Sequence, residues 1–79
     1  MNDVDKLDKL MDEEEQLIKD RNFYLTMMSC CDDIIKQSDN AGYQKITDQF
    51  KGEKEGYHQN WRDANNRLKA IEKEIYALT

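Results

Sequence analysis

The chain has 79 residues and a formal net charge of −5, with 37% charged and 38% hydrophobic residues. This length supports one small domain covering residues 1–79, and the composition is typical of long helices that bury one stripe and solvate the rest. The negative charge repels phosphate backbones, and no stretch approaches the ~18 apolar residues of a membrane span. We therefore expect neither direct nucleic-acid binding nor membrane insertion.

The first predicted helix covers residues 3–37, and the chain contains no proline to interrupt it. Its apolar residues fall on three neighbouring heptad positions and form one continuous face. Three polar residues, Glu14, Arg21 and Asp32, lie within this face. The apolar members of the face are Val4, Leu7, Leu10, Met11, Leu17, Ile18, Tyr24, Leu25, Met28, Cys31 and Ile35.

The run Ser-Asp-Asn-Ala-Gly at residues 38–42 is the strongest turn signal in the chain. Asn40 and Gly42 are the residues best suited to a left-handed conformation at this point. A connection of this length is common between antiparallel helices. We therefore predict that the chain reverses its direction here.

The second predicted helix covers residues 43–78 and has a more regular pattern. Its apolar residues repeat every seven positions, and in the later part a second set fills the spaces, as in the seam of a coiled coil. The first set is Tyr43, Phe50, Tyr57, Ala64, Ile71 and Leu78, and the second is Trp61, Leu68 and Ile75.

The start of this second helix departs from the regular pattern. Ile46 follows Tyr43 by three residues, so we expect the seam to shift between Phe50 and Trp61. Gly52 and Gly56 lie within the expected shift, and glycine destabilises a helix interior. Three interpretations stay open: a bend or break at residues 52–56, a close approach by another helix, or a cost that the helix tolerates.

Folding the chain about residue 40 brings the two apolar faces together. Leu17 then falls near Ala64, and Glu14 falls near Arg67, which supplies a charge partner for a polar position within the face. Because two independent patterns agree, we predict an all-α fold, an antiparallel two-helix hairpin of coiled-coil type.

A second group of apolar residues lies on the far side of the first helix from its main face. Phe23, Met27, Cys30 and Ile34 are spaced by four, three and four residues and form what we call the outer patch. One hairpin partner covers only one side of a helix, so we predict that the outer patch binds another helical protein or a second copy of the chain. Either partner would complete a helical bundle. Trp61 has core spacing and is also a candidate anchor for the partner.

The sequence offers little basis for catalysis or for a cofactor. Glu55 and His58 have a Glu-x-x-His spacing, but they flank the inward position of Tyr57, so we expect no metal site. The adjacent thiols of Cys30 and Cys31 point about 100° apart on a helix and cannot easily bond to each other, which favours the reducing cytoplasm. We expect no enzyme activity and no bound cofactor.

In size, charge and hairpin pattern, the chain resembles the small acidic helical hairpins that act as co-chaperones in bacterial secretion systems. The resemblance implies binding of an aggregation-prone helical client. By composition alone it also resembles small acidic inhibitors encoded by phages. We therefore predict a chaperone or adaptor that binds a helical protein. The alternatives are an acidic antagonist of a basic site, suggested by the acidic residues 12–15, and a structural homodimer.

Overall fold

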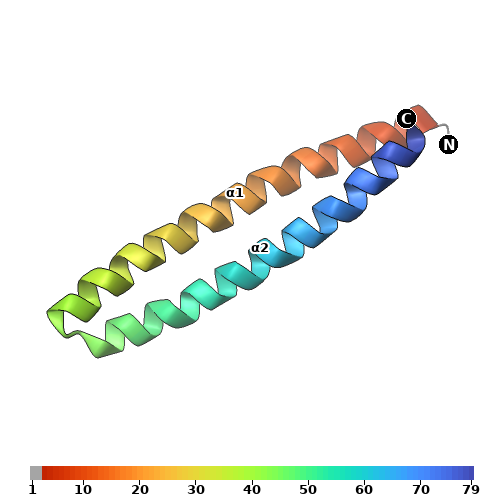
Figure 1. Ribbon diagram of the computed structural model, residues 1–79. Coiled ribbons are helices and arrows are strands. Elements are labelled where there is room, and N and C mark those ends of the chain that lie inside the picture. Colours follow the sequence, from red (N-terminus) through yellow and green to blue (C-terminus); the bar gives the residue numbers. More distant parts are fainter. Residues whose placement is uncertain (1–2) are drawn as a thin grey trace.

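In the computed structural model, which describes residues 3–79, two helices pack antiparallel against each other, α1 (Asp3–Ala41) and α2 (Gln44–Leu78). They form a rod with extents of 59 × 16 × 14 Å. The start of α1 and the end of α2 lie together at one end of the rod, and the turn lies at the other (Figure 1). The predicted helical hairpin is therefore confirmed, while its completion by a partner stays a prediction.

The connection between the helices is shorter than the sequence indicates, because α1 continues beyond residue 37 to Ala41. Gly42 adopts a φ of 81°, the left-handed conformation that glycine accommodates best. Its N–H donates to the Asp39 carbonyl at 3.1 Å, and the Tyr43 N–H donates to the Ser38 carbonyl at 2.8 Å. These two bonds form a Schellman motif, which ends α1 and leaves only Gly42 and Tyr43 between the helices.

A hydroxyl pair next to this turn fixes how α2 meets α1. The side chains of Ser38 and Thr47 are buried, and their oxygens lie 2.6 Å apart in a hydrogen bond. The helices therefore pair about the midpoint of Gly42 and Tyr43 rather than about residue 40.

The seam of α2 consequently begins at Thr47, which is 0% exposed, and not at the apolar residues before it. Tyr43 and Ile46 are 62% and 42% exposed, so their expected place in the core is wrong. Polar Thr47 occupies the position because the hydroxyl of Ser38 satisfies it there.

From Thr47 onward the seam advances by three and four residues without the expected shift. Lys54 is half-buried at the position where the shift was expected, and its ammonium reaches the Asp32 carboxylate at 2.6 Å. A lysine stem can lie along apolar surface while its charged end stays in water, which explains why a lysine fits a seam position.

Both helices contribute a complete seam with the same alternating spacing, and every member of either seam is buried or half-buried. Polar Glu14 and Arg21 belong to the α1 seam and are half-buried. The α1 seam is Leu7, Leu10, Glu14, Leu17, Arg21, Tyr24, Met28, Cys31, Ile35 and Ser38; the α2 seam is Thr47, Phe50, Lys54, Tyr57, Trp61, Ala64, Leu68, Ile71, Ile75 and Leu78.

The two glycines of α2 lie within an uninterrupted helix. A Cβ atom added at Gly52 or Gly56 meets nothing within 4 Å, so no described part of this chain approaches their backbone closely. Neither a break in the helix nor close packing by α1 therefore explains these glycines.

We predict that Gly52→Ala and Gly56→Ala each raise the free energy of unfolding by about 0.5–1 kcal/mol, because alanine loses less backbone entropy and has room for its methyl group. Gly42→Ala serves as the matched control and should lower the free energy by about 1 kcal/mol, because its φ is positive. Urea unfolding followed by circular dichroism measures all three. A loss of stability at residue 52 or 56 would contradict the open surroundings of these glycines.

Candidate partner-binding surface

The outer patch lies along the flank of α1 that α2 leaves open. Phe23 is 55% exposed and Cys30 is exposed, whereas Met27 and Ile34 are half-buried. The ring of Phe23 meets the ring of Tyr24 edge to face, with centroids 5.7 Å apart. Because Tyr24 belongs to the seam, this contact ties the most exposed member of the patch to the hairpin core.

Trp61 does not join the four residues of the outer patch. It is half-buried in the α2 seam, where its ring stacks on His58 with centroids 6.1 Å apart. His58 lines a hollow of about 410 Å³ together with Met28, Lys54 and Glu55. The indole N–H of Trp61 is buried and has no acceptor in residues 3–79, so packing of its ring must outweigh that cost.

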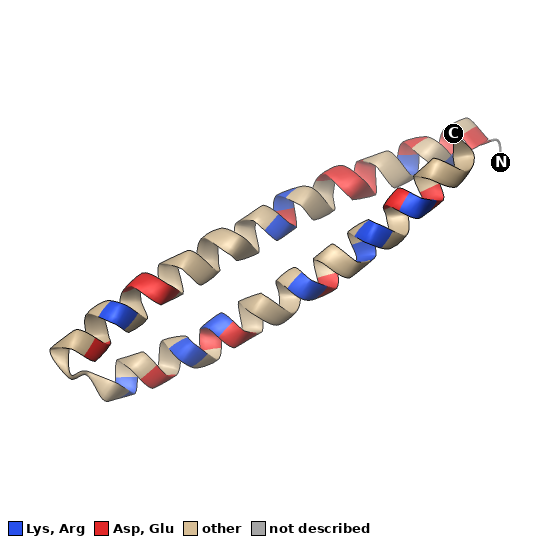
Figure 2. Cartoon of the chain, viewed as in Figure 1, with Lys and Arg blue, Asp and Glu red and all other residues tan. Residues whose placement is uncertain are grey.

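Three of the four residues of the outer patch, all but Ile34, nevertheless share one zone of the rod with Trp61, which we call the uncharged belt. It consists of residues 22–31 of α1 and residues 56–61 of α2, neither of which contains Asp, Glu, Lys or Arg. Figure 2 shows these tan segments at the middle of the hairpin, with charged residues on either side. In a chain that is 37% charged, such a zone is a clear departure from the rest of the surface.

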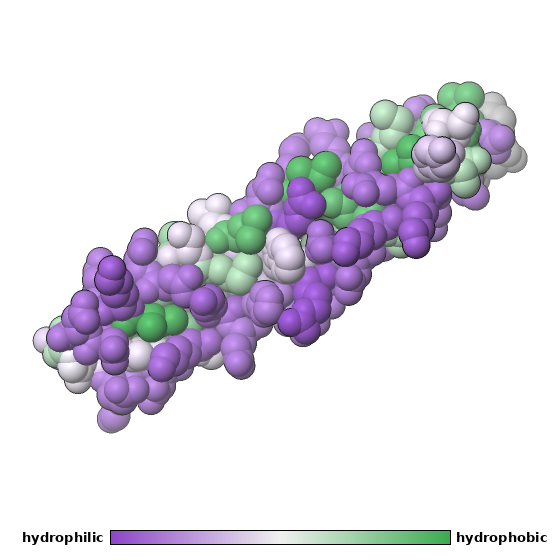
Figure 3. All heavy atoms as spheres, viewed as in Figure 1, coloured by the Kyte–Doolittle hydropathy of each residue, from purple (hydrophilic) through white to green (hydrophobic). Residues whose placement is uncertain are grey.

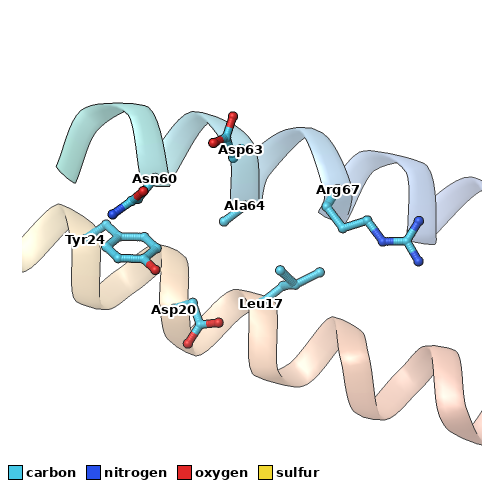
Figure 4. Close-up of a pocket in the computed structure, with 7 residues that line it drawn as sticks. All are labelled: Leu17, Asp20, Tyr24, Asn60, Asp63, Ala64 and Arg67. Atoms are coloured by element: carbon cyan, nitrogen blue, oxygen red, sulfur yellow. The ribbon is translucent and has the colours of Figure 1, made fainter. Parts of the chain in front are cut away.

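Two hollows lie on the helix–helix boundary at the two ends of the outer patch. The first, of about 280 Å³, is lined by Leu17, Asp20, Tyr24, Asn60, Asp63, Ala64 and Arg67. Leu17, Tyr24 and Ala64 point into it, whereas Arg67 extends away (Figure 4). The second, of about 330 Å³, is lined by Ile34, Gln37, Ser38, Ala41 and Tyr43 near the turn.

Near the second hollow, two residues that the sequence pattern placed in the core lie at the surface instead. Tyr43 lines this hollow beside Ile34, and Ile46 follows Tyr43 by one helical turn. Both are exposed, so they extend the apolar surface of the outer patch onto α2. Their signal in the sequence was ambiguous, because seven-residue spacing from Phe50 also fits Tyr43 into the seam.

The acidic run at residues 12–15 is partly occupied by partners. The Arg67 guanidinium donates two hydrogen bonds to Glu13, at 2.9 and 3.2 Å, so the partner of Arg67 is Glu13 and not Glu14. These bonds and the positive charge of Arg67 hold the pKa of Glu13 below its usual 4.5, although desolvation opposes the shift. Glu14 is half-buried, and Glu15 lies 3.4 Å from the Lys19 ammonium.

The thiols differ in their surroundings. Cys31 is 2% exposed, and burial, followed by the nearby charge of Glu53, raises the pKa of its thiol. A buried thiol of raised pKa is a poor nucleophile. Cys30 is exposed on the outer patch, and both cysteines are free.

Two further properties of residues 3–79 bear on function. Nowhere in this part of the chain do three His, Cys, Asp or Glu side chains gather closely enough to hold a metal ion. Over the same residues, neither helix has a stretch that is long and apolar enough to cross a membrane. The chain matches no protein-family model, no curated protein and no solved structure. A proposal about the function therefore rests on the surface described above.

We predict that Glu13→Gln lowers the melting temperature at neutral pH, because it removes the ion pair with Arg67. The folded-state pKa of Glu13 is lowered, so this stabilisation is present above the unfolded pKa and is lost as the pH falls through the folded pKa. The difference in melting temperature should thus be full at pH 7 and shrink as the pH falls below the ordinary glutamate pKa and through the lowered pKa of Glu13. Circular dichroism melts measure it.

The control for this pH series is Arg67→Gln, which removes the same ion pair from the other side. Adding Glu13→Gln to Arg67→Gln should change the melting temperature little, because the pair is already gone. A difference that stays constant between pH 7 and pH 3 would contradict the assignment.

Proposed function

We propose that the chain is a non-enzymatic protein–protein interaction module of chaperone or adaptor type, which binds a helical partner across the outer patch. The observation that supports this most strongly is the exposure of Phe23 and Cys30, two residues of the outer patch, within the uncharged belt of a highly charged chain. Exposed apolar surface bordered by polar residues is typical of contact sites. Figure 3 shows apolar residues in separate patches along the rod, each bordered by hydrophilic side chains.

The exposed area of the chain is large for its mass. A compact monomer of 9.4 kDa exposes about 5,000 Å². The hairpin exposes 5898 Å², which is roughly 900 Å² more. A partner in a standard protein–protein interface buries about 800 Å² of its own surface. The excess follows from the elongated shape of the rod, and it is similar in size to the surface that one docked partner would cover.

The shape and chemistry of the outer patch favour a helix as the partner. The four residues lie along a helix with a hollow at each end, so the apolar surface is long and narrow. A helix laid along such a surface buries side chains at every turn. Met27 and Phe23 offer an adaptable thioether and a rigid ring, a combination common where a protein accepts partners of differing shape.

The acidic-antagonist alternative receives less support. It relied on residues 12–15, but Glu13 pairs with Arg67, Glu15 pairs with Lys19, and Glu14 turns toward the seam. A run whose charges are partly neutralised is less able to imitate a phosphate backbone. Action in the cytoplasm, as in the secretion co-chaperones that the chain resembles, forms part of our proposal, because an exposed free thiol at Cys30 suits a reducing compartment.

We predict that Met27→Glu lowers partner capture by about tenfold or more, since a hot-spot change costs about 2 kcal/mol or more and about 1.4 kcal/mol is a factor of ten. The half-buried position of Met27 makes a charge there unfavourable against an apolar partner, yet the helices should remain formed because Met27 lies outside both seams. Quantitative affinity purification with mass spectrometry measures capture, and circular dichroism checks the helices.

The matched control is Asn66→Glu, which adds the same charge at an exposed position of α2 outside the uncharged belt. Proteins retained by Asn66→Glu and lost with Met27→Glu are partners of the outer patch. Equal recovery of the same proteins with both variants would show that the outer patch is not the binding surface.

A further inference from the structure

A second apolar surface on α1 lies outside the outer patch, and we call it the N-terminal stripe. It consists of Val4, Met11, Ile18 and Leu25, which repeat every seven residues and are 36% to 63% exposed. The sequence pattern placed all four in the core face of the hairpin. The structure leaves them exposed because α2 covers the seam, and the face of α1 is wider than one helix can cover.

The N-terminal stripe and the outer patch lie on opposite flanks of the seam. Met11, Ile18 and Leu25 each follow one seam position by one residue and another by four, and Val4 continues this spacing three residues before Leu7. The stripe therefore lies about 70° from the middle of the seam. Met27 and Ile34 each precede a seam position by one residue and lie on the other flank, whereas Phe23 and Cys30 lie farther round that flank and face away from the seam. A change in one surface therefore leaves the other intact.

The spacing of the stripe favours a helical occupant. It extends over roughly 32 Å of helix at ~1.5 Å per residue. Its seven-residue repeat matches that of the intramolecular seam, so a helix supercoiled around α1 can stay in contact along its full length. Near Leu25 the same flank holds the hollow lined by Met28 and His58.

The border of the stripe is acidic. Asp8 and Glu15 each follow a stripe residue by four positions, which puts them beside the stripe on the side away from the seam. Glu15 already pairs with Lys19 at 3.4 Å, so a cation of the partner would share this carboxylate with Lys19. Residues 3–15 contain seven acidic residues and two lysines. Figure 2 shows this concentration of red in the part of α1 that lies nearest the chain ends.

We propose that the N-terminal stripe binds a basic amphipathic helix of another protein, with apolar residues at three- and four-residue spacing and Lys or Arg beside them. Its apolar residues would cover the stripe, and its cations would face Asp8 and Glu15. A second copy of this chain fits poorly here, because it would bring like acidic borders together in a chain of net charge −5. An anionic membrane surface is disfavoured for the same reason.

The test uses a synthetic amphipathic helix of about 22 residues with leucines at the seam spacing and lysines beside them, and a matched peptide with glutamates in place of the lysines. Isothermal titration calorimetry should show one lysine peptide bound per chain, and binding about tenfold weaker for the glutamate peptide. Raising the salt concentration should weaken binding of the lysine peptide, because salt screens its attraction to the acidic border of the stripe. Absence of lysine-peptide binding, or equal binding of both peptides, would overturn the proposal.

Variants then locate the binding surface. Met11→Gln with Leu25→Gln should reduce lysine-peptide affinity by at least about tenfold, while circular dichroism stays unchanged because both residues are exposed. Asp8→Asn with Glu15→Gln should make the lysine-peptide affinity less dependent on salt concentration, because the acidic border is removed. Unchanged affinity in the first double variant would show that the basic peptide adheres elsewhere, which overturns the proposal.

Two controls separate this proposal from the proposed function and from self-association. Met27→Glu changes the opposite flank and should leave lysine-peptide affinity within about twofold of the unchanged chain, whatever it does to partner capture. Sedimentation equilibrium should show a monomer at micromolar concentration. A dimer that Met11→Gln with Leu25→Gln dissociates would make the occupant a second copy and overturn the proposal.

Discussion

The contact between Ser38 and Thr47 at the closed end of the hairpin sets the orientation of α2. Their hydroxyls share a buried hydrogen bond of 2.6 Å, next to a turn that the left-handed Gly42 makes as short as two residues. With so short a connection, α2 has little freedom to rotate or slide along α1. Both seams then follow in steps of three and four residues from these two positions. The turn and the contact between Ser38 and Thr47 therefore determine which side chains of α2 face water.

A two-helix fold offers each helix a single partner, and this limit explains the surface of the chain. The apolar face of α1 is wider than α2 can cover, so the outer patch and the N-terminal stripe are left on opposite flanks. The same openness lets polar residues occupy seam positions, because Lys54 can leave the seam edge and reach Asp32. A helical partner on either flank would extend the packing that the seam begins.

The sequence predicts this fold well where apolar spacing is unambiguous, as from Tyr57 to Leu78. It misplaces the start of α2, because Tyr43 and Ile46 have the hydrophobicity of core residues and Thr47 does not. Hydrophobic periodicity predicts neither the hydrogen bond between the hydroxyls of Ser38 and Thr47 nor the length of a turn that backbone hydrogen bonds close. The outer patch could be predicted from the sequence because its four residues share one helix. The exposure of Val4 and Met11 could not be predicted, since it depends on how much of α1 a single neighbouring helix covers.

The orientation of α2 at the closed end can be measured directly by nuclear Overhauser contacts in a ¹³C- and ¹⁵N-labelled chain. The account predicts contacts between the side chains of Ser38 and Thr47 and none between Ile35 and Ile46, together with slow solvent exchange of the Thr47 hydroxyl proton. Contacts from Ile46 into the α1 seam, with the Thr47 side chain exposed to water, would contradict it. In that case α2 would be rotated, and the surfaces assigned to partners would change with it.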